Sequence, residues 1–308
     1  MTNSGRARDG ERDALQRFVF EKARVRGELV RLDDAWREVL RRREYPPAVR
    51  EVLGDLMAAC ALMAATLKFQ GGELVLQIQG GGPLRLLVVE CRADLTMRAT
   101  ARFDEDLAGL EERATLRALT RGGHCAITID PGPGLQAYQG VVPLHGATAA
   151  EALEEYMARS EQIETRFWLA ADGQRAAGLL LQRLPDHGGK AAPDDDDDLW
   201  NRVNVLGRTL TREELLELPG RDILRRLFHD EELRVFESLP VRFACRCSRE
   251  TVAGIIRMVG RDEIEAVLAE RGTVEIACEF CALRYSFDRA QALAALADRA
   301  APTPTPAG

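Results

Sequence analysis

The longest apolar stretch of the chain lies between residues 46 and 67. Pro46 and Pro47 suit a first helical turn, and the apolar positions from Val49 to Met57 then recur at helical spacing. Beyond Met57 the stretch is apolar on all sides as far as Leu67, which predicts a helix at the centre of the core. Gly71-Gly72 ends this helix.

Alternating apolar and polar positions predict several strands. Leu74 to Gln79 and Leu84 to Glu90 predict a hairpin around Gly80–Pro83, whose triple glycine opens no helix and lacks the Gly-Lys-Ser/Thr ending of a phosphate-binding loop. Further strands are expected at 97–103, 125–130, 135–142, 166–171 and 177–184. Residues 18–30, in which apolar and polar positions alternate less regularly, are expected to contain another strand. Helices are expected at 148–160 and at 32–43, the latter capped by Asp33 or Asp34. This mixture without regular βαβ alternation predicts an α+β fold.

The composition changes at Pro185 and divides the chain into four expected parts. Residues 1–185 form an N-terminal mixed sheet-and-helix domain, with the first 16 residues flexible. Residues 186–240 are interpreted as a metastable helical connector with little core of its own, with helices at 199–210, 211–218 and 222–236. Its five aspartates, Asp194 to Asp198, lack EF-hand spacing and indicate solvated linker. Residues 241–290 form a small zinc-binding module, and 291–308 a helix end and disordered tail.

Four of the seven cysteines occur as Cys245-Arg-Cys247 and, thirty residues later, Cys278-Glu-Phe-Cys281. Two close pairs separated by a loop that folds back are typical of a tetrahedral Zn²⁺ site with four thiolate ligands, although a one-residue gap is unusual. The module has few apolar residues, so metal binding and folding are expected to be one event. Each pair is also able to close as a disulfide, which would remove the ligands. The spacing leaves a structural site and a redox switch both open.

Charge and hydropathy exclude several functions. The net charge of −7 argues against general affinity for nucleic acid or anionic membranes. The longest uninterrupted apolar run, residues 56–65, is too short to span a bilayer, and residues 1–25 contain no apolar signal-peptide segment. The expected compartment is therefore the cytoplasm, where paired cysteines are more often metal ligands or redox groups than permanent disulfides.

Two other functions would use the same cysteines. A nucleic-acid-binding zinc ribbon needs a basic surface, whereas residues 241–300 hold nine arginines, no lysine and nine acidic residues. A thiol–disulfide oxidoreductase would place Cys278 and Cys281 at a helix start in a thioredoxin-like frame, which the pattern lacks. Elsewhere, His124 is expected at the surface beside a core Cys125, Cys60 in the core, and Cys91 partly exposed at a strand end.

The cysteine arrangement resembles the redox-switch domain of the thirty-three-kilodalton heat-shock chaperone family. The N-terminal part resembles the same family in several motifs. Those motifs include Arg26-Gly-Glu-Leu-Val30, Leu76-Gln-Ile-Gln79, Ser160-Glu-Gln-Ile163 and Thr165-Arg-Phe-Trp168. The resemblance runs from about residue 17 to residue 290, nearly the whole chain.

This resemblance implies a holdase that works without ATP and is not an enzyme. In the family the reduced form, with one Zn²⁺ on Cys245, Cys247, Cys278 and Cys281, is inactive. Peroxide with mild heat, or hypochlorite, links Cys245 with Cys247 and Cys278 with Cys281. Zinc release then unfolds the module and the connector, the protein dimerises, and apolar surface captures unfolding client proteins. No catalytic residue and no further cofactor is expected.

Overall fold

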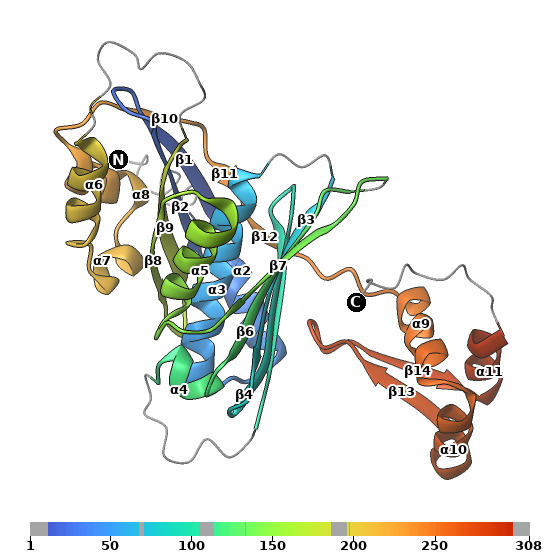
Figure 1. Cartoon of the computed structure of the whole chain (residues 1–308). Helices are drawn as coiled ribbons and strands as arrows, with labels where there is room; N and C mark the ends of the chain where they lie inside the picture. Colours follow the sequence, from blue (N-terminus) through green and yellow to red (C-terminus); the bar gives the residue numbers. More distant parts are fainter. Residues whose placement is uncertain are drawn as a thin grey trace, which may run out of the picture. The chain divides into compact units, whose positions relative to one another are not determined.

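The protein is described by a computed structural model that covers residues 12–67, 71–104, 114–132, 134–185, 196 and 198–297. The chain divides into two compact units, residues 1–244 and 245–308 (Figure 1). Helices and strands are mixed in both units, which confirms the α+β prediction.

One six-stranded sheet, here sheet A, is built from both ends of the first unit. Its strand order is β10-β1-β2-β9-β8, and β11 also pairs with β1; all of these pairs are antiparallel. The strands are β1 (Ala14–Phe20), β2 (Val25–Leu32), β8 (Thr165–Ala171), β9 (Ala176–Arg183), β10 (Leu233–Val235) and β11 (Leu239–Pro240). Gly27 of β2 lies opposite Phe18, and a Cβ there would come within 2.1 Å of the Phe18 ring. The aromatic ring therefore requires glycine at this position.

A second six-stranded sheet, sheet B, has the order β12-β5-β4-β3-β6-β7. Its strands are β3 (Glu73–Gly80), β4 (Leu84–Arg92), β5 (Thr96–Phe103), β6 (Gly123–Asp130), β7 (Tyr138–Pro143) and β12 (Arg242–Phe243), which runs parallel to β5. Alternate residues of the central strands are fully buried, as Leu74, Leu76 and Ile78 are in β3. This pattern is typical of an antiparallel sheet with one face on the core.

The long apolar helix α3 (Pro47–Thr66) lies between the two sheets, as Figure 1 shows, and contacts strands of both. It begins at Pro47, and all its residues from Leu56 to Ala64 are buried. The predicted central helix is thus confirmed. Helices α2 (Asp34–Arg42), α4 (Leu116–Thr120) and α5 (Ala149–Tyr156) complete this part, and a π-helical turn follows at Met157–Glu161. Thr148 caps α5 in a capping box, as its spacing from Glu151 predicts.

The opposite face of sheet A is covered by three helices of the connector, α6 (Leu199–Gly207), α7 (Arg212–Glu217) and α8 (Gly220–Phe228). In β9, Leu179 and Leu181 pack in the cluster with these helices, while Leu180 between them packs in the cluster with α3. Nearly all of β9 is buried because both faces of its sheet are covered. The connector therefore shares its apolar cluster with the sheet.

Several predicted boundaries are wrong. The helix expected at 222–236 ends at Phe228, and Leu233–Val235 instead pairs with β1 at the sheet edge. The uneven strand expected at 18–30 is two strands, and β1 includes Ala14–Gln16, which were expected to be flexible. Strand β7 begins at Tyr138 and not at residue 135. Residues 1–11, 186–195 and 298–308 lie outside the described residues.

The second unit is small. It contains α9 (Arg249–Val259), α10 (Arg261–Arg271), the hairpin β13 (Thr273–Ala277) and β14 (Arg284–Asp288), and α11 (Arg289–Ala297). Ser248 caps α9, Gly260 ends it, and Gly272 ends α10 in the left-handed region. The buried core cluster of its described residues comprises Val252, Ile256, Ile264, Leu268, Val274, Phe287, Ala292 and Ala295. Two of these belong to α11, so the helix end expected after residue 290 contributes to the core.

Candidate metal centre

The four cysteines of the second unit lie together. All four sulfur atoms are within 4.8 Å of one another, with Cys245 Sγ 3.6 Å from Cys278 Sγ and Cys247 Sγ 3.3 Å from Cys281 Sγ. Thiolates about 2.3 Å from a central tetrahedral ion lie about 3.8 Å from each other. The observed spacing therefore fits four ligands around one metal ion.

The second pair lies in the turn of the β13–β14 hairpin. The backbone N–H of Cys278 donates to the carbonyl of Leu283 at 2.9 Å, and that of Ala282 donates to the carbonyl of Cys278 at 2.8 Å. Ala282 adopts a left-handed backbone conformation, with φ of 58°. These contacts curl the chain so that Cys278 and Cys281 present their sulfurs to the same point.

The first pair immediately precedes α9. Ser248, directly after Cys247, accepts a hydrogen bond from the backbone N–H of Thr251 and so caps the helix. The guanidinium of Arg249 donates to the carbonyl of Ser286 at 2.8 Å and lies over the ring of Phe287. Arg249 thus holds the start of α9 against β14, close to the second pair, a role that sequence reasoning missed.

The hydroxyl of Tyr285 donates a hydrogen bond to Cys247 Sγ at 3.2 Å. This contact raises the pKa of Tyr285 to about 12, because the neutral phenol is the form that donates. Burial raises the pKa of Cys278 and of Cys281, the most buried of the four cysteines. For Cys245, burial is outweighed by hydrogen bonds from the Cys247 backbone and neighbouring thiols, so its pKa is lowered to about 7. The cluster therefore contains one thiol that ionises near neutral pH.

Replacing Tyr285 with phenylalanine should weaken metal binding about ten- to a hundredfold, because hydrogen bonds to a ligand atom orient it and tune its donor strength. Competition against a chromogenic chelator measures this affinity. Tyr138→Phe, on half-exposed β7 of the first unit, should leave it unchanged. Equal affinities for Tyr285→Phe and the unchanged protein would show that this contact does not support the site.

The remaining three cysteines lie apart from this cluster, in the first unit. Cys60 and Cys125 are buried, as predicted, and His124 beside Cys125 is partly exposed. The prediction for Cys91 is wrong: it is fully buried because its side chain faces α3 from β4. Burial raises the pKa of Cys60 and raises that of Cys125 to about 12, so these thiols resist ionisation.

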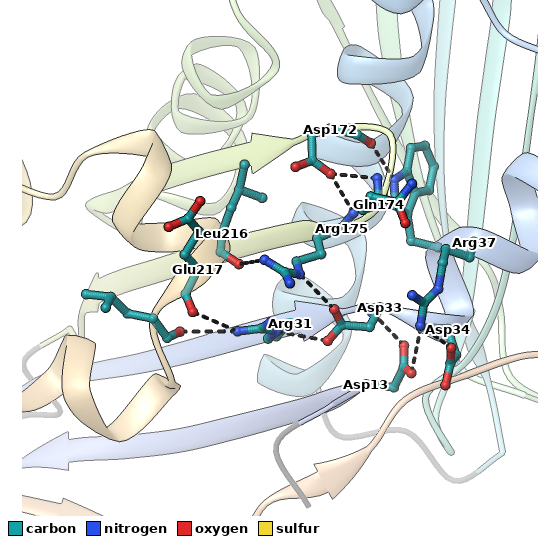
Figure 2. A network of polar contacts seen from close by, with 12 residues as sticks. Asp13, Arg31, Asp33, Asp34, Arg37, Asp172, Gln174, Arg175, Leu216 and Glu217 are labelled. Atoms are coloured by element: carbon teal, nitrogen blue, oxygen red, sulfur yellow. Dashed lines mark hydrogen bonds and ion pairs between the residues drawn. The ribbon is translucent and has the colours of Figure 1, made fainter. Parts of the chain in front are cut away.

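The connector helix α7 is held at its C-terminal end by a polar network centred on Asp33, shown in Figure 2. The Asp33 carboxylate pairs with Arg31 Nε at 2.9 Å and with Arg175 Nε at 3.2 Å. Arg175 in turn donates to the carbonyl of Leu216, and Arg31 to those of Glu217 and Leu218. The arginines thereby satisfy carbonyl groups that a helix end leaves without partners.

Asp33 is the N-cap residue of α2, as the sequence predicts, but its side chain does not cap the helix. The Asp13 carboxylate does so instead, accepting backbone N–H groups of Asp33, Asp34 and Ala35 at 2.8–2.9 Å. No sequence signal links Asp13 to a helix start twenty residues away, because the two meet only through the pairing of β1 with β2.

The N-terminal end of α7 is anchored as well. Thr211 forms a capping box with Glu214, as its spacing predicts. Arg212, the first residue of the helix, pairs with Glu51 of α3 at 3.0 Å and donates to the carbonyl of Ala171. Of the aspartate run, Asp196 and Asp198 pair with Arg202 of α6. Docking of the connector thus combines an apolar cluster with polar contacts at both ends of one helix.

The Hsp33 protein family model matches residues 13–288 of the chain, from β1 to the end of β14. The chain belongs to the Hsp33 family. A 33 kDa chaperonin of Methylobacillus flagellatus is 49% identical over 280 residues, covering 91% of this chain and 93% of that protein. A 33 kDa chaperonin of Chromobacterium violaceum is 51% identical over 281 residues, covering 91% and 92%.

The Hsp33 fold is also found in a solved structure. The crystal structure of the 33 kDa chaperonin (heat shock protein 33 homolog) of Thermotoga maritima matches with a TM-score of 0.77. It is 22% identical and covers 92% of this chain and 98% of that one. The protein is therefore an Hsp33-type chaperone whose cysteine cluster is compatible with zinc and redox regulation. No helix in the described part of the chain is long and apolar enough to span a membrane.

Proposed function

We propose that this protein is a redox-regulated holdase that needs no ATP, inactive when reduced and zinc-bound and active when its four cysteines are oxidised. The observation that carries the proposal is the cluster of four sulfurs within 4.8 Å, in a unit whose apolar core cluster contains only eight buried residues among those described. A core of that size is marginal by itself. A change at the cysteines therefore changes the folding of the whole unit.

Zinc is the proposed ion, one per chain, on Cys245, Cys247, Cys278 and Cys281. Four thiolates in a closed tetrahedron are the donor set of structural zinc sites and leave no open position for a substrate. The bound ion would supply cross-linking of α9 to the β13–β14 turn. That role supports the assignment of the protein as a chaperone and not an enzyme.

Oxidation is proposed to form two disulfides. Each pair of thiols releases two electrons and two protons to one hydrogen peroxide, giving one S–S bond and two water molecules. The pairings proposed are Cys245 with Cys247 and Cys278 with Cys281, on the basis of the family resemblance and of closeness in sequence. Close sulfur–sulfur contacts of 3.6 and 3.3 Å also run between the pairs, so disulfide mapping must decide the connectivity.

The four parts of the chain are proposed to act in order. Loss of the thiolate ligands unfolds the module at 241–290 and removes order from the connector at 186–240. The apolar cluster between the connector and sheet A then opens, and the exposed face binds unfolding client proteins. The N-terminal domain, 1–185, stays folded, whereas α11 unfolds with the module because it shares the module's core. The active form is a homodimer. We also propose that the protein acts in the cytoplasm and binds neither nucleic acid nor membranes.

Zinc release and chaperone activity, measured together, test this proposal. Reduced protein is treated with peroxide at raised temperature while a chelator reports zinc and light scattering reports aggregation of a heat-unfolded client, without ATP. We expect one zinc per chain to be released as suppression of aggregation appears, with disulfides within each pair. Cys247→Ser, which lacks one of the four ligands, should bind no zinc and suppress aggregation without peroxide. Full activity of the reduced, zinc-bound protein would refute the switch, and catalytic insulin reduction would favour an oxidoreductase.

A further inference from the structure

A cavity of about 370 Å³ lies between sheet A and α8, within the first unit. Leu29, Leu233 and Val235 line it from the sheet, and Leu224 and Phe228 line it from the helix. Leu29, Leu224 and Phe228 are buried, so this part of the wall is apolar and preformed. The volume is within the range of about 300–1,000 Å³ that is usual for small-molecule sites.

Positive side chains surround this apolar wall. The basic and titratable residues that line the cavity are Arg31, Arg221, Arg225 and His229. Its one acidic lining residue, Glu231, is already paired with Arg202 at 2.9 Å. Arg225 is exposed and has no ion-pair partner in the part of the chain that the structure describes. The cavity therefore offers apolar contact and an uncommitted cation together.

We propose that this cavity binds a small amphipathic anion, specifically a medium-chain fatty carboxylate. Its alkyl tail lies against Leu29, Leu224 and Phe228, and its carboxylate pairs with Arg225. An apolar wall with the uncommitted cation of Arg225 at its edge favours this class over neutral or cationic amphiphiles. Because the walls come from both the sheet and the connector, the ligand binds only the docked connector and stabilises it.

Calorimetric titration of the reduced, full-length protein with decanoate, below its micelle-forming concentration, tests the site. We expect one saturable site per chain. Nonanoate, which is one methylene shorter, should bind about fourfold more weakly, because each methylene of the tail adds a similar increment of free energy when it is buried. Decanol, with the same tail and no charge, should bind at least about tenfold more weakly.

Variants at the cavity locate the binding. Arg225→Gln should weaken decanoate binding at least about tenfold and leave decanol unchanged, whereas Arg117→Gln, exposed on α4, should alter neither. Val235→Glu should repel the carboxylate, while Val235→Gln is the neutral control. Decanoate should also slow amide exchange in α8 of the unchanged protein. The proposal would be overturned if decanoate and decanol bound with equal affinity, or if Arg225→Gln left the affinity for decanoate unchanged.

Discussion

Replacing Cys281 with serine should abolish metal binding and unfold the second unit of the protein. The four sulfurs form one ligand set, and Cys281 is the buried member of it. Zinc contributes on the order of 10–16 kcal/mol to the folding of small metal-dependent domains. The apolar core of this unit cannot replace that contribution, because the cluster of its described residues contains eight buried side chains, two of them alanines.

Hydrogen exchange followed by mass spectrometry, together with metal analysis, measures this effect. In Cys281→Ser, amides of α9, α10 and the β13–β14 hairpin should exchange without measurable protection, while α3 and sheet B stay protected. Cys125→Ala is the matched control, since it removes a buried cysteine of the first unit and should keep the metal. Protected α9 and α10 amides in metal-free protein would show that the unit folds without its ion.

Replacing Phe228 with alanine should loosen the connector in the reduced protein, with a cost of about 3–5 kcal/mol. Phe228 is 1% exposed, and its ring packs edge-on against Phe20 at 5.2 Å and near Phe18 at 6.1 Å between centroids. It is thus the main aromatic contact between α8 and sheet A. Its loss leaves a cavity that the sheet cannot close, because Phe18 and Phe20 are fixed by strand pairing.

Limited proteolysis and amide exchange of residues 198–235 report this loosening. Both should increase in Phe228→Ala while zinc stays bound, and the proposed function adds partial client binding without oxidant. Phe167→Ala is the control, since Phe167 is buried in the cluster with α3 on the other face of the sheet. It should lower the stability of the first unit as a whole. The predicted docking role would be contradicted if amides of the connector exchanged no faster in Phe228→Ala than in Phe167→Ala.

Helices and strands were predicted correctly from the sequence where a single local pattern was strong. The central helix was predicted from Pro46-Pro47 and its apolar run. The 222–236 helix was predicted too long because the charged positions of 229–236 resemble a helix surface. In the structure, Leu233–Val235 gains hydrogen bonds from the edge of β1, and tertiary pairing outweighs local propensity.

By itself, the sequence determined the α+β class, the family resemblance and the four cysteines that meet at one point. These depend on periodicity, capping residues and ligand spacing, which are properties of neighbouring residues. Only the tertiary structure decided the contacts that connect distant segments: Tyr285 on Cys247, Asp13 at the start of α2, and Arg31 and Arg175 on the end of α7. Such contacts depend on strand order and on which face a helix covers, and neither is encoded in local spacing.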